Sequence, residues 1–192
     1  MRKRPRTSRP VCPARRTGSR PVAGLLNAAG AFLVGETATG YNAAMNLTTT
    51  APRSAKDKMA GLVSLKRTID KARAFNEGTL GEYDYDCPHD KPLFEFLGTD
   101  GETFAGKVQE LKTDDAIEQW VRSEFLSTKT PAEIQAFNDA RMRWHPEPGD
   151  HSYDYFMKLR DEVAPGRNDV VTWFDLLDLD EKRPVPNPTR LD

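Results

Sequence analysis

Apolar residues recur at spacings of three and four along the segment that begins near residue 55. This spacing places side chains on one face of an α-helix. Ser54 stands where an N-cap residue belongs, because its hydroxyl can accept from an orphan backbone N–H of the first turn. Gly78 is a typical terminator. The pattern therefore predicts a helix from Ala55 to about Asn76, and its apolar face consists of Met59, Leu62, Leu65, Ile69 and Ala72.

Further stretches show the same periodicity with recognisable start and stop signals. Asp90 stands as a cap before Pro92, and Gly98 ends that short helix. Asp100 and Thr113 are the caps that we predict for the next two helices. Another start is marked by Thr130-Pro131-Ala132-Glu133, which supplies a cap, a first-turn proline and a glutamate at the third helical position. Two last helices are indicated by Tyr153, Phe156, Leu159 and Val163, and by Val171, Phe174 and Leu177.

The stretch 78–91 interrupts this helical pattern. Gly78, Gly81 and Pro88 punctuate it, and two tyrosines alternate with acidic residues as in an extended piece. The whole pattern predicts six to seven short helices and almost no strand. We therefore expect an all-α fold, a compact bundle of short helices with one irregular loop segment at 78–91.

The 192 residues divide into three parts by composition. Residues 45–183 are long enough to form a single all-α domain with its own core. Residues 184–192 are rich in proline and are predicted to be a loose tail. Residues 1–44 join a basic Arg/Pro-rich stretch, expected to be disordered, to a short apolar one. Three interpretations of this part stay open: an extension read from an early start codon, a secretory signal, or a basic arm that contacts nucleic acid.

Charge is unevenly distributed along the chain. The formal net charge is −1, yet the first 20 residues contain eight basic and no acidic ones, and residues 45–192 hold 20 basic against 28 acidic. An acidic body repels phosphate, which counts against nucleic acid as its partner. Two cysteines are too few for a disulfide framework and favour a reduced, cytoplasmic protein. No apolar run is long enough for a membrane span.

Motifs of strong catalytic meaning are missing from the sequence. It contains no phosphate-binding loop, no Gly-x-Ser-x-Gly elbow and no His-Glu-x-x-His pair. Titratable residues gather at 82–90, where Cys87 and His89 accompany four carboxylates; this cluster suits metal binding or catalysis, or else a solvated turn. His145 and His151 bracket a second polar linker with the same two interpretations. Cys87 is either a small buried residue or a reactive thiol. No metal ligand set is predicted. The three tryptophans are expected in the core, and the basic side chains of 55–76 on a solvated face.

Three strings match one family in the same order along the chain: PRSAKDKMAGLVSLKRTIDKARA, GTLGEYDYDCPHDKPLFEFLG and VVTWFDLLDLDEKR. Residues 47–183 therefore resemble DUF5069, a mostly bacterial family of unknown function. The resemblance implies a family and no reaction. His89 departs from the family pattern, in which an apolar residue more usually follows Cys-Pro. A site common to the family would use the matched polar or reactive residues Asp70, Lys71, Arg73, Glu82, Tyr83 and Cys87.

These observations leave three hypotheses of function. The first is a domain that binds a small-molecule ligand or a protein partner, with Asp70, Lys71 and Arg73 as binding candidates. The second is an enzyme or metal-binding protein with a loop site around 82–90, in which Glu82, Tyr83 and Cys87 are the catalytic candidates. The third is a secreted helical domain. The sequence identifies neither a cofactor nor a substrate.

Overall fold

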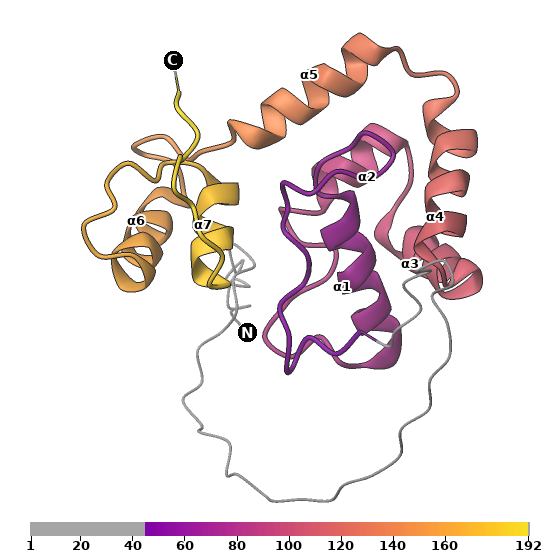
Figure 1. Cartoon of the computed structure of the whole chain (residues 1–192), viewed down its shortest axis with the longest axis horizontal. Coiled ribbons are helices and arrows are strands. Elements are labelled where there is room, and N and C mark those ends of the chain that lie inside the picture. The colour runs from indigo at the N-terminus through magenta and orange to yellow at the C-terminus, as the bar shows by residue number, and fades with distance from the viewer. Residues whose placement is uncertain (1–44, 192) are drawn as a thin grey trace, which may run out of the picture.

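The structure is a computed structural model that describes residues 45–191, so the interpretations of 1–44 lie outside the described residues. Within this range the chain forms seven α-helices and one π-helical turn (Figure 1). No strand occurs in this range beyond an isolated bridge between Met59 and Leu62. The predicted all-α class is confirmed. The bounds are α1 Leu65–Glu77, α2 Lys91–Leu97, α3 Gly101–Leu111, α4 Asp114–Val121, η1 Arg122–Leu126, α5 Pro131–Met142, α6 Tyr153–Val163 and α7 Trp173–Asp180.

Most of the predicted helix starts are formed by the expected side chains. Asp100 accepts from the backbone N–H of Thr103, and Thr113 accepts from that of Ala116. Thr130 and Glu133 form a complete capping box at the start of α5. These bonds satisfy N–H groups that have no partner within the helix. The capping signals are therefore confirmed for α3, α4 and α5.

The first helix begins later than predicted. α1 starts at Leu65, and the preceding Ser64 has a left-handed backbone with a φ of 68°. The segment before it is a turn, in which Met59 and Leu62 exchange backbone hydrogen bonds of 3.1 and 2.9 Å. Gly61 at a φ of 87° makes this turn possible, since a glycine adopts positive φ without strain. The apolar side chains at 59 and 62 thus enter the core from a turn, which their spacing alone does not distinguish from a helix.

The apolar side chains form two main cores. The N-terminal region, residues 45–126, packs α1 to α4 around a cluster that includes the fully buried Leu65, Ile69 and Phe104. Trp120 is only partly buried against this cluster. The C-terminal region, residues 143–191, packs α6 against α7 around Trp173, with Trp144 partly buried beside it. All three tryptophans were expected in the core; Trp173 is fully buried there, whereas Trp120 and Trp144 lie at its edge.

α5 connects the two regions (Figure 1). Asn138 of this helix accepts from the backbone N–H of Val63 at 3.0 Å and donates to the carbonyl of Gly61 at 2.8 Å. A small shared core also joins the regions, since Val63 packs with Phe174 and Leu177 of α7. The two regions therefore meet through apolar contacts as well as through α5.

The segment after α7 has no helix, yet it is attached to the domain. Val185 is buried, and its carbonyl accepts from the Arg167 guanidinium at 2.8 Å. The backbone N–H of Thr189 donates to the Asp175 carboxylate at 2.8 Å. Residues 184–191 thus lie against α7 through specific contacts, where the proline-rich composition led us to expect a loose tail.

Candidate functional site

α1 buries charged side chains as well as apolar ones. Arg67, Asp70, Lys71 and Arg73 are all buried. The expected solvated face is therefore wrong for the three basic residues among them. The physical reason is that carboxylates from the start of α2, the start of α4 and the end of α7 reach α1, so each buried cation has an anion within reach.

Asp70 and Arg73 belong to an ion-pair network that we call the Arg53 cluster: Arg53, Asp70, Arg73 and Asp114. Arg53 binds the Asp70 carboxylate through its guanidinium, with a contact of 2.8 Å. Asp114 at the start of α4 receives both Arg53 at 2.5 Å and Arg73 at 2.9 Å. The cluster fixes the segment before α1 against α1 and α4.

Lys71 and Cys87 meet on another side of α1, in a group that we call the Lys71 centre: Lys71, Cys87 and Asp90. The Lys71 ammonium lies 2.5 Å from the Asp90 carboxylate and 3.3 Å from the Cys87 sulfur. Asp90 also accepts from the Thr68 hydroxyl at 3.2 Å. Its carboxylate makes no capping bond to α2, so the predicted N-cap role of this side chain is wrong. Lys71 and Asp90 are each 1 % exposed, and Cys87 is 6 % exposed.

A third group of charges joins the two regions, and we call it the charge seam: Lys56, Arg67, Asp175, Asp178 and Glu181. Arg67 donates to both carboxylate oxygens of Glu181, at 2.9 and 2.6 Å. Lys56 lies 2.5 Å from Asp175 and 3.2 Å from Asp178. Burial raises the pKa of Asp175, but the hydrogen bonds from Lys56 and Thr172 outweigh it and hold the pKa below its ordinary value.

Tyr83 borders the charge seam, and Glu82 does not. The Arg67 guanidinium lies 5.7 Å from the centre of the Tyr83 ring. Burial and the neighbouring Glu181 carboxylate raise the pKa of the Tyr83 hydroxyl, which therefore stays protonated. Glu82 and Tyr83 both line a cavity of about 270 Å³ between the loop and residues 47–50. The six candidate residues are thus distributed over three surroundings as the pairs Asp70–Arg73, Lys71–Cys87 and Glu82–Tyr83.

His89 is buried among aromatic rings. It packs against Trp144 and Trp173, with ring centres 4.7 and 5.4 Å away. Neither of its ring nitrogens has a hydrogen-bond partner, and the same holds for Trp173 Nε1 and Arg141 Nε nearby. Burial, together with the positive charges of Lys71, Arg67 and Arg141, holds the pKa of His89 far below its ordinary value. His89 is therefore neutral near pH 7, and the solvated-turn interpretation is wrong at this position.

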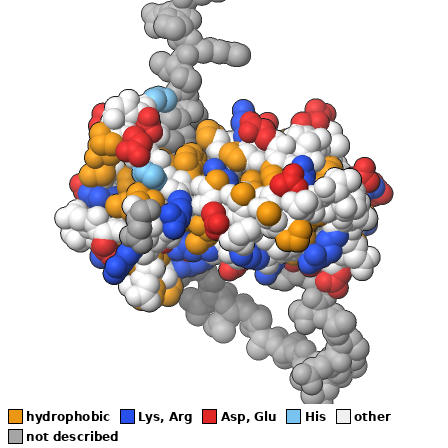
Figure 2. All heavy atoms as spheres, turned by 90° about the horizontal axis from the view of Figure 1, so that it is seen from above, with side chains coloured by type: hydrophobic (Ala, Val, Ile, Leu, Met, Phe, Trp, Pro, Cys, Tyr) orange, Lys and Arg blue, Asp and Glu red, His pale blue; other side chains and the backbone are white. Residues whose placement is uncertain are grey.

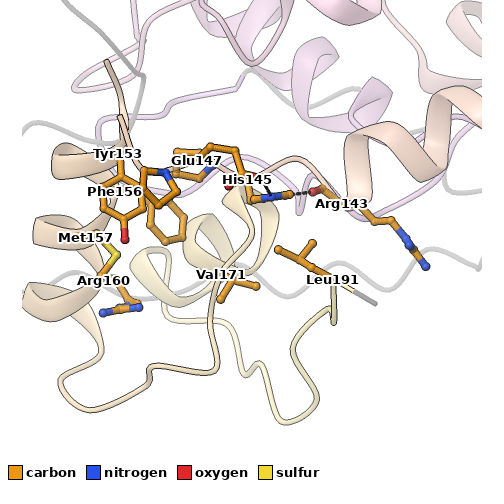
Figure 3. Close-up of a pocket in the computed structure, with 11 residues that line it drawn as sticks. Arg143, His145, Glu147, Tyr153, Phe156, Met157, Arg160, Val171 and Leu191 are labelled. Carbon is orange, nitrogen blue, oxygen red and sulfur yellow. Dashed lines mark hydrogen bonds and ion pairs between the residues drawn. The ribbon is translucent and has the colours of Figure 1, made fainter. Parts of the chain in front are cut away.

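A cavity beside α6 has a volume of about 610 Å³. We call it the α6 pocket. Its lining is Arg143, His145, Pro146, Glu147, Pro148, Tyr153, Phe156, Met157, Arg160, Val171 and Leu191. Figure 3 shows Tyr153, Phe156, Met157 and Arg160 coming from α6, with His145 and Glu147 from the linker facing them. Val171 and Leu191 close the lower side, while the Arg143 side chain points away.

The polar groups of the α6 pocket are few and of mixed sign. His145 contacts the carbonyl of Arg143 at 2.7 Å and the Glu147 carboxylate at 2.8 Å. The bond to this carbonyl and the Glu147 charge raise the pKa of His145 despite some burial. Arg160 is buried and pairs with Asp161 at 3.1 Å. Figure 2, a view from above Figure 1, shows hydrophobic side chains interrupting the charged surface.

The two linker histidines do not line the same pocket. His145 lines the α6 pocket, whereas His151 is exposed and is not part of its lining. Among residues 45–191, no three His, Cys, Asp or Glu side chains are grouped so that they would hold a metal ion. Sequence reasoning identified His145 and missed Tyr153 and Arg160, because helical spacing assigned the whole of 153–163 to a core-facing helix.

Over residues 45–191, the protein is an all-helical domain with buried ion pairs and a pocket beside α6. The chain belongs to the family described as Domain of unknown function (DUF5069), whose model matches residues 49–183. The resemblance noted for residues 47–183 is thereby confirmed. No curated protein matches the chain. Over the part of the chain that the structure describes, every helix is too short or too polar to cross a membrane.

Proposed function

We propose that the protein binds a small molecule in the α6 pocket, and that this ligand is largely apolar with one anionic group. The observation that carries the proposal is the cavity itself. Its volume of about 610 Å³ falls within the usual range for small-molecule sites. Its lining combines apolar side chains with a few polar groups, which is the ordinary composition of such sites.

The charge of the lining favours an anion. Arg160 donates through Nε and Nη2 to Asp161, and a guanidinium carries further N–H donors. His145, with its raised pKa, adds positive charge as the pH falls. Tyr153 contributes a hydroxyl, while Phe156, Met157 and Val171 offer apolar surface to the remainder of the ligand. A carboxylate on a short alkyl or aryl chain satisfies both requirements.

Titration calorimetry with octanoate, octanol and inorganic phosphate tests this proposal. We expect octanoate to bind, and octanol and phosphate to bind at least about tenfold more weakly, because each lacks one of the two required features. Arg160→Gln should weaken octanoate about tenfold. Arg122→Gln is the control, since Arg122 forms a local pair with Glu118 and does not line the pocket. Octanoate binding that is absent, or equally affected by both variants, would contradict the proposal.

The enzyme hypothesis around 82–90 has less support than ligand binding. Cys87 does not line the cavity that Glu82 and Tyr83 share, and none of the three lines the α6 pocket. Asp70, Lys71 and Arg73 are buried and have ionic partners within the protein, which supports a structural role better than a ligand-binding one. We retain a cytoplasmic location as part of the proposal, because a chain with only two cysteines suits a reducing compartment.

A further inference from the structure

Two potential nucleophiles lie in contact inside the Lys71 centre. Lys71 Nζ is 3.3 Å from Cys87 Sγ, and both side chains are almost fully buried. They come from different parts of the fold, α1 and the irregular segment that follows it. The sulfur and the nitrogen are in van der Waals contact, and a covalent bond between them requires their separation to fall to about half of this value.

Charged groups surround both the sulfur and the nitrogen. Lys71 and the nearby Arg141 place positive charge around the sulfur, and positive charge stabilises a thiolate. The Asp90 carboxylate, 2.5 Å from Nζ, is placed to take the proton that an attacking amine must lose. Asp90 is itself held by Thr68 and by the backbone N–H of Cys87. Lys71 as the nucleophile, the Cys87 sulfur as the atom that it attacks and Asp90 as the proton acceptor are therefore already in contact.

We propose that Lys71 and Cys87 are a modification site, at which a small peroxide oxidant causes their side chains to join through a sulfur–nitrogen bond. In the first step hydrogen peroxide converts the Cys87 thiol to a sulfenic acid and releases water. In the second step the Lys71 amine attacks the sulfur, the S–O bond breaks and a second water leaves. The net change is a two-electron oxidation of the protein, with two hydrogens lost and peroxide reduced to two waters.

Burial favours this intramolecular product over the alternatives. Cys87 is 6 % exposed, so only an oxidant little larger than water can reach its sulfur. A protein thiol is too bulky to reach the same sulfur, so the adjacent amine is the first group to meet the sulfenic acid. Two equivalents of a small thiol reverse the link, because they restore the amine and the Cys87 thiol and become a disulfide. The site is independent of the α6 pocket.

Intact-mass measurement on the full chain carrying Cys12→Ser tests the proposal. This background removes the other cysteine, so a disulfide within the chain cannot cause the same mass change. After hydrogen peroxide treatment we expect a mass lower by about 2 Da and a peptide that links Lys71 to Cys87, and a reducing thiol should abolish both. Trypsin should no longer cleave after Lys71.

Two further variants separate the amine from the charge. Lys71→Arg keeps a cation but lacks the nucleophilic amine, so we expect oxygen uptake in steps of about 16 Da and no loss of 2 Da. Lys91→Arg on the exposed start of α2 is the control and should still form the link. If Lys71→Arg fails to fold, the Cys12→Ser protein alone tests the proposal: fragmentation of its linked peptide shows whether the bond joins Lys71 to Cys87. An unmodified Cys87, oxygen uptake without a link, or a link about 14 Da heavier that retains oxygen would each overturn the proposal.

Discussion

The charge seam and the α6 pocket both pair basic with acidic side chains, and they differ in the burial of the acidic partner. In the seam, Arg67 and Glu181 have side-chain exposures of 4 % and 3 % and share two hydrogen bonds. In the pocket, His145 pairs with Glu147, whose side chain is 69 % exposed. A charge whose partner is buried with it contributes to the fold, whereas a charge whose partner is in water can exchange that partner for a ligand.

The Lys71 centre is the most extreme example on the buried side of this comparison. Removing one member of a buried pair leaves the other without water and without a counter-charge. Removing one member of an exposed pair leaves a solvated charge, which costs little. The stability of variants therefore measures the difference between the two kinds of region directly.

The largest effect is expected for Lys71→Met, because it removes the ammonium that pairs with the buried Asp90 carboxylate. We expect the free energy of unfolding to fall by about 3–5 kcal/mol. Adding Asp90→Leu should recover much of this loss, because two apolar side chains replace the pair. Urea denaturation gives these values. Lys107→Met is the control, since Lys107 pairs with an exposed Glu110 and should cost less than about 1 kcal/mol. Equal losses for the two lysine variants would refute the comparison.

The second effect concerns pH and contrasts a buried histidine with a pocket histidine. His89 is neutral in the fold, and its ordinary value of 6.5 applies after unfolding. Below pH 6.5 the unfolded chain therefore binds a proton that the folded chain does not, and stability falls towards a slope of about 1.4 kcal/mol per pH unit. His145 has a raised pKa, so its contribution has the opposite sign and is lost as pH rises.

Denaturation at a series of pH values between about 7.5 and 5 measures both contributions, since carboxylates titrate mostly below this range. His89→Phe should remove the loss of stability on acidification. His145→Gln should leave that loss in place and make it slightly steeper. A pH profile that His89→Phe does not change would show that the buried imidazole is not its cause.

Local sequence signals predict some of the helix starts and not others. Capping residues act within one turn, so Asp100, Thr113 and Thr130 predicted helix starts correctly. Asp90 has the same local signature, yet its carboxylate binds Lys71 from another helix, and no local pattern contains that information. The start of α1 was misplaced for a related reason, because a turn stabilised by Asn138 of α5 imitates helical spacing.

The candidate site was predictable only in part. The chain patterns and the family resemblance drew attention to Lys71 and Cys87, which do meet, although nothing in the sequence indicated that Asp90 would complete the group. The α6 pocket depends on residues from α6, the preceding linker and the segment after α7. Such a cavity arises from tertiary packing, so neither periodicity nor a motif reveals it.

A third, smaller effect is expected at α5, the helix that joins the two regions. Thr130→Ala removes the hydroxyl that accepts from the backbone N–H of Glu133 and keeps the backbone N–H that donates to the Glu133 carboxylate, and it should lower the free energy of unfolding by about 1 kcal/mol. Thr130→Ser keeps the hydroxyl and should restore most of that value. Thermal unfolding followed by circular dichroism compares the two variants. An equal loss for Ser and Ala would mean that the threonine methyl group, and not the cap, matters here.

The smallest effect is expected at the α6 pocket itself, where Glu147→Gln removes the carboxylate that contacts His145. At pH 7 we expect the free energy of unfolding to change by less than about 1 kcal/mol, because Glu147 is largely in water. The same variant removes a negative charge from the pocket lining and should therefore strengthen octanoate binding, which calorimetry measures. Glu110→Gln is the control: it removes a similarly exposed carboxylate far from the lining and should change neither stability nor binding. A large loss of stability on Glu147→Gln would contradict this comparison. It would show that His145 and Glu147 are a structural pair like those of the charge seam, so that neither charge is available to a ligand in the α6 pocket.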